Sequence, residues 1–169
     1  MPLRSLTALC LVLWSGVALA QGTAIELGTT PVNPDAPVEI TADSLSVDRE
    51  TGFAIFTGNV RVVQEQMTLS ADVIEVRYTE ADKAQPGEEG GFDQVDAKGN
   101  VIFINGEDVA ESDNAVLTPR DDRVVMTGNV LLTQGPTVIA GERMVFNLAT
   151  GAGRMEGRVR TVIRPGGSE

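Results

Sequence analysis

An internal repeat of 29 residues limits how this chain can fold more than any other feature of its sequence. Each copy carries a Gly-Asn-Val step, except the last, where arginine replaces asparagine. These steps occupy residues 58–60, 99–101, 128–130 and 157–159. A second shared segment begins eleven residues after each of the first three glycines and ends in an acidic residue, and an unpaired copy of it lies at 40–43. Repeats of this length bury their apolar face only by stacking on their neighbours.

One spacing between the Gly-Asn steps is longer than the others. The first two glycines are 41 residues apart, which corresponds to one repeat plus an insertion of 12 residues. Residues 80–91 have the composition of that insertion, since they are rich in charge, proline and glycine and lack apolar periodicity. We therefore predict a surface loop at 80–91, a place where added length costs little conformational entropy.

Within each copy the residues alternate between apolar and polar, as in half-buried strands. Strand-like stretches cover 53–63, 68–76, 124–133 and 137–146, with turn residues at 48–52, 134–136 and 149–151. No stretch after residue 20 has the period of a helix. Short strands at regular spacing predict an all-β protein, either a sandwich, a barrel or a stacked solenoid.

The Gly-Asn step lies inside an apolar strand pattern. Glycine at such a position marks a bulge or a sharp bend, and strand-like residues continue on both sides of it. If every copy bends there, the units stack into a two-sided layer with a U-shaped section. The alternative is an ordinary hairpin turn at the same glycine.

Four columns of the repeat are mostly apolar and predict the interior of the stack. They are Ile40, Leu69, Ala110 and Ile139; Leu45, Ile74, Ala115 and Met144; Val47, Val76, Leu117 and Phe146; and Val62, Phe103 and Leu132, followed by Thr161. A plain hydrophobic core explains these columns by itself. An aliphatic interior that is open along one edge would also suit acyl chains.

A carboxylate recurs in each copy, at Asp43, Asp72, Asp113 and Glu142. Calcium needs several converging oxygen ligands, and one acid per 29 residues is too sparse for that. We expect these side chains to be exposed or to cap turns.

The first twenty residues have the parts of a secretory signal peptide. Arg4 precedes an apolar run without charge, and Ala18 to Ala20 supply small residues at the cleavage site. Cleavage after Ala20 would leave 149 of the 169 residues and would change the formal charge from −11 to −12. We then expect a lead segment at 21–37, one domain at 38–165 and a short tail at 166–169.

The composition excludes several classes of function. The sequence has no histidine, and its one cysteine, Cys10, lies in the predicted signal peptide. Ordinary zinc sites and nucleophiles activated by histidine are therefore excluded. The acidic balance argues against nucleic acid as a partner. No pair of acids is placed to act on one cleft, so we predict no enzyme, no metal and no cofactor.

The repeat resembles a known family. Residues 40–48, 56–60 and 71–76 are similar to the OstA-like domain of periplasmic lipopolysaccharide-transport proteins, and 124–130 and 159–165 resemble its later repeats and closing strand. The resemblance implies a twisted β-jellyroll, an open, taco-like stack of antiparallel strands. It implies that the interior shelters lipid A acyl chains, and that protomers join head to tail between inner-membrane and outer-membrane components in the periplasm.

Carried over by position, the resemblance assigns a lipid-binding groove. Val38, Ile40, Phe103 and Leu117 match groove positions of the family, and the remaining positions follow by periodicity. These are Val47, Val62, Leu69, Ile74, Val76, Leu132, Ile139, Met144 and Phe146. The insertion at 80–91 and the four-residue tail depart from the family pattern, so the C-terminal contact stays open.

Arginines crowd the end of the chain, at Arg154, Arg158, Arg160 and Arg164. They can form a solvated end, or they can contact an anionic headgroup or an acidic face of another protomer. Two alternatives to lipid carriage stay open. One is a membrane-associated relative from the same pathway, and the other is a self-assembling structural β protein without a lipid ligand.

Overall fold

The computed structural model of the chain describes residues 23–26, 36–48, 50–78 and 92–164. These residues form eleven strands and one short 3-10 turn, so the predicted all-β class is confirmed. The predicted signal peptide, the loop at 80–91 and the tail at 166–169 lie outside the described residues. Within the described ranges, no helix is long and apolar enough to cross a membrane.

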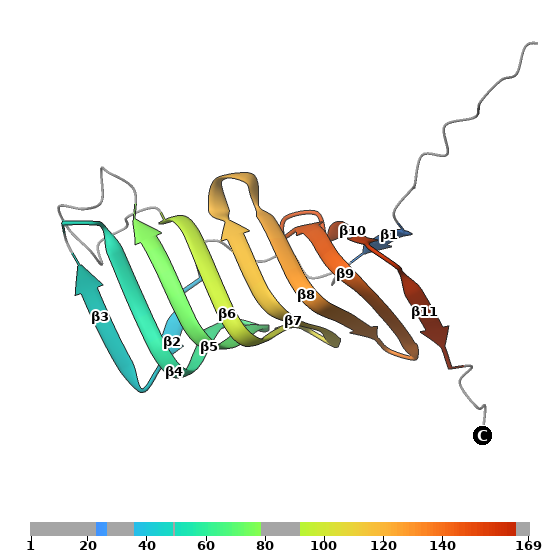
Figure 1. Ribbon diagram of the computed structural model, residues 1–169, viewed down its shortest axis with the longest axis horizontal. Helices are drawn as coiled ribbons and strands as arrows, with labels where there is room; N and C mark the ends of the chain where they lie inside the picture. The colour runs from blue at the N-terminus through green and yellow to red at the C-terminus, as the bar shows by residue number, and fades with distance from the viewer. Residues whose placement is uncertain (1–22, 27–35, 49, 79–91, 165–169) are drawn as a thin grey trace, which may run out of the picture.

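The strands follow one another in a simple meander (Figure 1). In chain order they are β1 (Thr23–Glu26), β2 (Glu39–Thr41), β3 (Ser44–Asp48), β4 (Phe53–Gln64), β5 (Met67–Tyr78), β6 (Phe92–Asn105), β7 (Asp108–Thr118), the 3-10 turn η1 (Pro119–Asp121), β8 (Arg123–Gln134), β9 (Thr137–Asn147), β10 (Ala152–Glu156) and β11 (Arg160–Ile163). Consecutive strands from β4 to β10 pair antiparallel. The predicted strands and turns therefore lie where the alternation placed them.

Each Gly-Asn step bends its strand, which confirms the bend and excludes the hairpin turn. Gly58 and Asn59 have φ angles of 80° and 45°, and the pairing of β4 with β5 shifts its register between Thr57 and Val60. The same shift recurs in every pair of long strands from β5 to β9. Glycine and asparagine tolerate this left-handed conformation better than other residues do.

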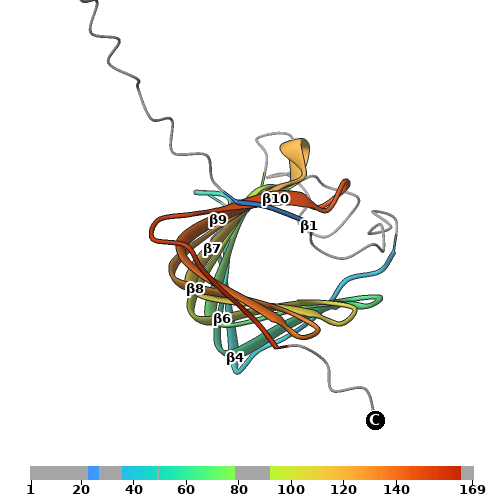
Figure 2. The same ribbon diagram turned by 90° about the vertical axis from the view of Figure 1, so that its right-hand side faces the viewer.

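The bends align into a fold line that divides the sheet into two limbs. Limb one consists of β2, β11 and one half of each strand from β4 to β9. These halves are the parts of β4, β6 and β8 that follow their Gly-Asn steps, and the parts of β5, β7 and β9 that pair with them. Limb two consists of β3, the opposite ends of β4–β9, β10 and β1. At the two ends of the sheet the bend separates the strand into two pieces, so β2 and β3 both pair with β4, and β10 and β11 both pair with β9. Seen along its axis, the sheet is a curved trough (Figure 2).

The four predicted apolar columns are continuous rows across the sheet. The columns that begin with Ile40 and Val62 belong to one row of limb one, because Ile40 pairs with Val62, Val62 with Leu69, and so on. That row reads Ile40, Val62, Leu69, Phe103, Ala110, Leu132, Ile139 and Thr161. The columns that begin with Leu45 and Val47 run across limb two in the same way. Side chains of one row face the same side of the pleat.

A ladder of side-chain hydrogen bonds follows the fold line. The Asn59, Asn100 and Asn129 amides donate to Asp43, Asp72 and Asp113 at 2.8–2.9 Å. In the last copy Arg158 donates to Glu142 at 2.9 Å. All four carboxylates are exposed, as predicted, and each joins neighbouring strands at the bend. Among the described residues, no group of three or more acids gathers as a metal site would require.

Replacing Asn129 by alanine should lower the free energy of unfolding by about 1.5 kcal/mol. The variant loses the bond to Asp113 and holds alanine at φ 49°, and each effect costs on the order of 1 kcal/mol or less. Asn129→Gly keeps the conformational freedom and should recover part of the loss. Asn114→Ala, at an exposed position on β7 that pairs regularly with Thr127, serves as the control in urea denaturation. Equal losses in Asn129→Ala and Asn114→Ala would contradict a stabilising ladder.

Candidate functional site

The candidate site is the apolar space between the two limbs. Side chains from both limbs meet there, and the rings of Phe103 on limb one and Phe146 on limb two lie 5.5 Å apart. This contact spans the interior, because the two residues belong to β6 and β9, which do not pair. The limbs therefore pack on each other in the middle of the molecule.

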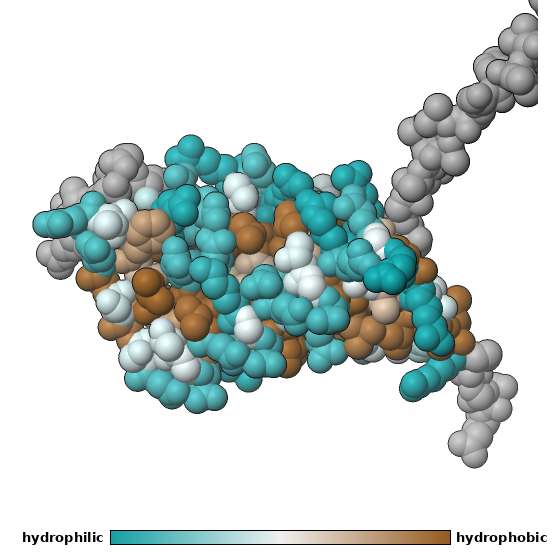
Figure 3. Space-filling model, viewed as in Figure 1, coloured by the Kyte–Doolittle hydropathy of each residue, from teal (hydrophilic) through white to brown (hydrophobic). Residues whose placement is uncertain are grey.

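Exposure of the inward rows changes along the sheet. At the C-terminal end, Met126, Leu132, Met144 and Met155 have no exposed surface. At the N-terminal end, Leu45 and Val47 occupy equivalent rows but are 55% and 48% exposed. The interior is thus a closed core under β7–β10 and an open apolar surface at β2 and β3. The space-filling view shows apolar patches between hydrophilic side chains on this face, at the β3 end as well as in the middle and at the opposite end (Figure 3).

The predicted groove residues fall into two groups. Seven are buried: Ile74, Val76, Phe103, Leu132, Ile139, Met144 and Phe146. Val38 and Val47 are exposed, and Ile40, Val62, Leu69 and Leu117 are half-buried against the core. The half-buried and exposed positions can be reached from solvent without separating the limbs, whereas the buried positions can meet a ligand only if the limbs part.

The four C-terminal arginines are spread over both limbs and the fold line. Arg154 lies on β10 in limb two, Arg158 at the fold line, and Arg160 on β11 in limb one. Arg154 contacts Glu156 at 2.7 Å, and Arg158 contacts Glu142 at 2.9 Å. The hydrogen bond from Arg143 and the charge of Arg154 hold the pKa of Glu156 below its usual range. Two of the four are thus already bound to acids of the same chain.

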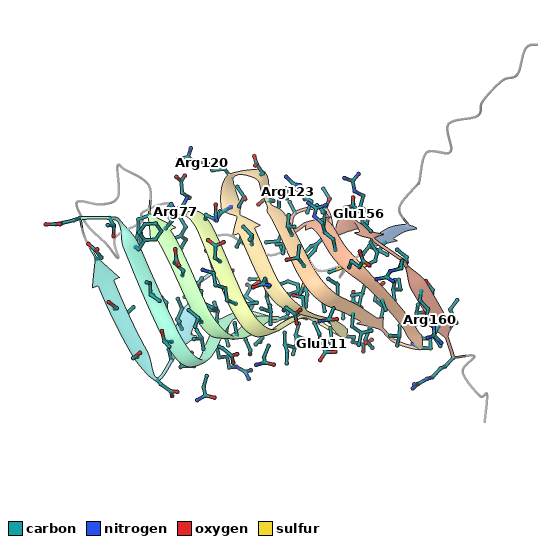
Figure 4. All side chains as sticks on the ribbon, in the orientation of Figure 1. Arg77, Glu111, Arg120, Arg123, Glu156 and Arg160 are labelled. Atoms are coloured by element: carbon teal, nitrogen blue, oxygen red, sulfur yellow. The ribbon has the colours of Figure 1, made fainter. Side chains whose placement is uncertain are left out.

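Sequence reasoning missed a second set of arginines. Arg77, Arg120 and Arg123 lie along one rim of limb two (Figure 4). Arg77 lies over the ring of Phe53, and Arg120 contacts Asp93 at 3.3 Å. Their only sequence signal is that all three flank the turns that close limb two. Arg77 and Arg123 are one residue away from the inward Val76 and Val124, so their side chains belong to the outer face of this rim.

A shallow depression of about 350 Å³ lies over β8–β10. Asp121, Arg123 and Arg154 contribute its charged lining, and Phe146 is the one predicted groove residue that borders it. The depression therefore does not coincide with the predicted groove.

The fold and the interior define a repeat-built, open β-jellyroll with an apolar trough. The family model described as "LptA/(LptD N-terminal domain) LPS transport protein" matches residues 39–152. The chain belongs to this family, and the predicted resemblance is confirmed.

Individual relatives agree with this assignment. An uncharacterized protein of Rhizobium meliloti (strain 1021) is 27% identical over 155 residues, which cover 89% of this chain and 83% of that protein. The lipopolysaccharide export system protein LptA of Escherichia coli (strain K12) is 30% identical over 118 residues, which cover 66% of this chain and 60% of that protein. This chain therefore matches less than two thirds of that LptA.

A solved structure shares the fold. It is LptH from Pseudomonas aeruginosa, described as the LptA homologous periplasmic component of the conserved lipopolysaccharide transport device. The TM-score is 0.67 at 18% sequence identity, and the match covers 80% of this chain and all of that one. The open jellyroll predicted from the resemblance is therefore the fold of this chain.

Proposed function

We propose that this protein is a periplasmic carrier that holds lipopolysaccharide by its lipid A acyl chains in the trough between the limbs. The observation that carries the proposal is the apolar surface left open at the N-terminal end of the trough, where Leu45 and Val47 are exposed on inward rows. Large exposed aliphatic side chains that continue a buried core are typical of a binding surface. Membership of a lipopolysaccharide-transport family supports lipopolysaccharide as the ligand.

Binding would use the hydrophobic effect alone. Each methylene removed from water contributes about 0.8 kcal/mol, so a few buried methylenes stabilise the complex by several kcal/mol. The headgroup phosphates would stay outside the trough, because the chain is strongly acidic. Arg77, Arg120 and Arg123 on the rim of limb two are the cations that we propose for contact with these phosphates.

Carriage would need no chemistry at the site. A lipid can pass along a row of similar troughs when its affinity is nearly equal from one to the next. In this proposal copies of the chain join head to tail, and the row connects components of the inner membrane with components of the outer membrane. A signal peptide cleaved after Ala20 would deliver the chain to the periplasm.

Leu117→Asp should weaken lipopolysaccharide binding at least tenfold. Leu117 is half-buried on an inward row of β7, away from both ends of the sheet, and a carboxylate there would have to lose its water when an acyl chain enters. A tenfold loss corresponds to about 1.4 kcal/mol. Binding is measured by displacement of a fluorescent lipid probe with purified lipopolysaccharide.

Val116→Asp is the matched control, because Val116 is the adjacent half-buried residue on the same strand and points to the opposite face. It should bind within twofold of the unaltered chain. Circular dichroism and melting temperature establish that each variant is folded, and Leu117→Gln replaces Leu117→Asp if the latter unfolds. Unchanged binding by a folded Leu117 variant would overturn the groove, and the self-assembling structural protein would then be the better reading.

A further inference from the structure

The two ends of the sheet differ in how their strand edges are covered. At the N-terminal end all five residues of β3 are exposed, and within the described residues its only strand partner is β4. At the C-terminal end, β11 has β9 as its only partner among the described strands, but β10 is covered on its second side by β1. One half of the C-terminal edge is therefore closed by a strand from the far end of the chain.

β1 occupies the position that a strand of the β3 type would take. Gly153 of β10 pairs with Phe146 on one side and with Ile25 on the other. Ile25 thereby continues the row of Val47 and Phe146, and Thr23 continues the row of Leu45 and Met144. Both β1 and β3 run antiparallel to the strand that they cover.

The short sequences of the two strands also match in this register. β1 reads Thr-Ala-Ile-Glu, and residues 45–48 of β3 read Leu-Ser-Val-Asp. In both, a β-branched aliphatic residue faces inward at the third position and an acid follows it. The segment at 23–26 thus shares this pattern with residues 45–48, although no residue is identical.

β1 pairs with the sheet over a short length. Its pairing with β10 covers four residues, whereas the central strands pair over eight or more. Ile25, which is 7% exposed, joins it to the hydrophobic core. Beside it β11 stays open, and Val162 and Ile163 are 41% and 66% exposed. A strand that paired with β10 and β11 together would bury more than β1 does.

The charges at the two ends of the sheet are complementary. Arg154, Arg158, Arg160 and Arg164 lie on or next to β10 and β11, where Glu156 contacts Arg154 and Glu142 contacts Arg158, so the arginines outnumber these acids by two. Glu39, Asp43 and Asp48 lie on or beside β2 and β3 at the other end. Suppose that β2 of another copy pairs with the side of β11 that faces away from β9, with Ile40 in the row of Thr161. Thr41 would then lie opposite Arg160, with Glu39 and Asp43 diagonal to it.

We propose that β1 is an internal substitute for β3 of a second copy of this chain. It covers β10 in the single chain, and its release exposes the edge on which β2–β3 of the next copy docks. Because β1 and the incoming strand compete for the same backbone groups, β1 acts as an autoinhibitory contact on assembly. The inference rests on the head-to-tail arrangement of the proposed function, and its tests do not depend on lipid binding.

A disulfide between β1 and β10 tests the competition. Ala24 and Arg154 are register partners, and Cα atoms in antiparallel pairs lie about 4.5–5.5 Å apart, within the range that a disulfide spans. The only cysteine of the sequence is Cys10, so Ala24→Cys/Arg154→Cys in the chain from residue 21 adds the only thiols. We expect the oxidised protein to need at least tenfold higher concentration to assemble than the same protein after reduction, as measured by light scattering over a dilution series.

The control disulfide joins β7 to β8 through Val116→Cys/Val125→Cys, a register pair far from both ends. Its oxidation should leave assembly unchanged. Equal assembly of the oxidised and reduced Ala24→Cys/Arg154→Cys protein would overturn the proposal, and so would a failure of both forms to assemble. Lipopolysaccharide binding by Leu117→Asp is measured in a separate experiment. The proposal of a lipid-binding trough and the proposal of docking at the β10 edge can therefore be contradicted independently.

A crosslink between two copies identifies the incoming strand. In the proposed register Ser46 of one copy takes the place of Ala24 opposite Arg154 of the other. A chain with Ser46→Cys mixed with a chain with Arg154→Cys should form a disulfide-linked pair under mild oxidation. Gln66→Cys, at an exposed turn on limb one, is the control. A Ser46→Cys yield no higher than the Gln66→Cys yield, in chains that assemble, would overturn the assignment of β3.

Discussion

Replacing Leu132 by alanine should lower the free energy of unfolding by about 2–5 kcal/mol, the range for a large aliphatic residue truncated in a packed core. Leu132 has no exposed surface and lies in the inward row between Ala110 and Ile139. The space that the alanine leaves cannot be filled without moving two neighbouring strands. Urea denaturation followed by circular dichroism measures the loss.

Leu131→Ala is the matched control, because it removes the same atoms one residue away from a half-buried, outward position. Its cost should stay near 1 kcal/mol or less. If both variants lost equal stability, the C-terminal part of the trough would not be a closed core. The comparison therefore also tests whether the buried groove positions are occupied by protein side chains before any lipid enters.

Gly128→Ala should cost about 2–3 kcal/mol, the second large effect. Gly128 has φ 80°, and a Cβ atom there would lie 2.9 Å from the Cβ of Asp113. The left-handed conformation costs alanine on the order of 1 kcal/mol. Moving Asp113 away also breaks its hydrogen bond to Asn129, which contributes about 1 kcal/mol more.

Gly135→Ala separates these two causes. Gly135 also has positive φ, at 51°, but apart from its chain neighbours no residue lies within 4 Å of the Cβ that alanine would add. It should therefore lose only about 1 kcal/mol. In the double variant Gly128→Ala/Asp113→Ala the contacts with the carboxylate are gone, although the Cβ of residue 113 remains, and the hydrogen bond to Asn129 is lost only once. The double variant should therefore lose less stability than the two single variants together. Full additivity would mean that the close approach of Asp113 to Gly128 does not limit the bend.

The repeat pattern of the sequence predicts most of the fold. Alternation along 53–63 or 137–146 fixes which side chains share a face, because successive residues in a strand point to opposite sides. The position of Gly58-Asn59 within such a strand fixes the bend, since few other residue pairs tolerate two consecutive positive φ angles. The inward rows follow from these two local rules, and so they could be listed before the structure was known.

The ladder along the fold line was only partly foreseen. The exposure of Asp43, Asp72, Asp113 and Glu142 follows from their polarity. Their hydrogen-bond partners do not follow from polarity, because the bond from Asn100 to Asp72 depends on the register of two strands across the 80–91 insertion. The recurrence of the same pair, Asp113 with Asn129, in a copy without insertion shows that the register is set by the bend and not by the connecting length.

By itself the sequence determined the all-β class, the bends and the residues that face inward, because those depend on neighbours within a strand. Only the tertiary structure decided how deeply each inward residue is buried. Leu45 and Met144 share one column of the repeat, yet Leu45 is 55% exposed and Met144 is fully buried, because among the described strands β3 is paired on one side only. The structure also decided that β1 covers β10, since four residues carry no local signal for a partner more than a hundred residues away.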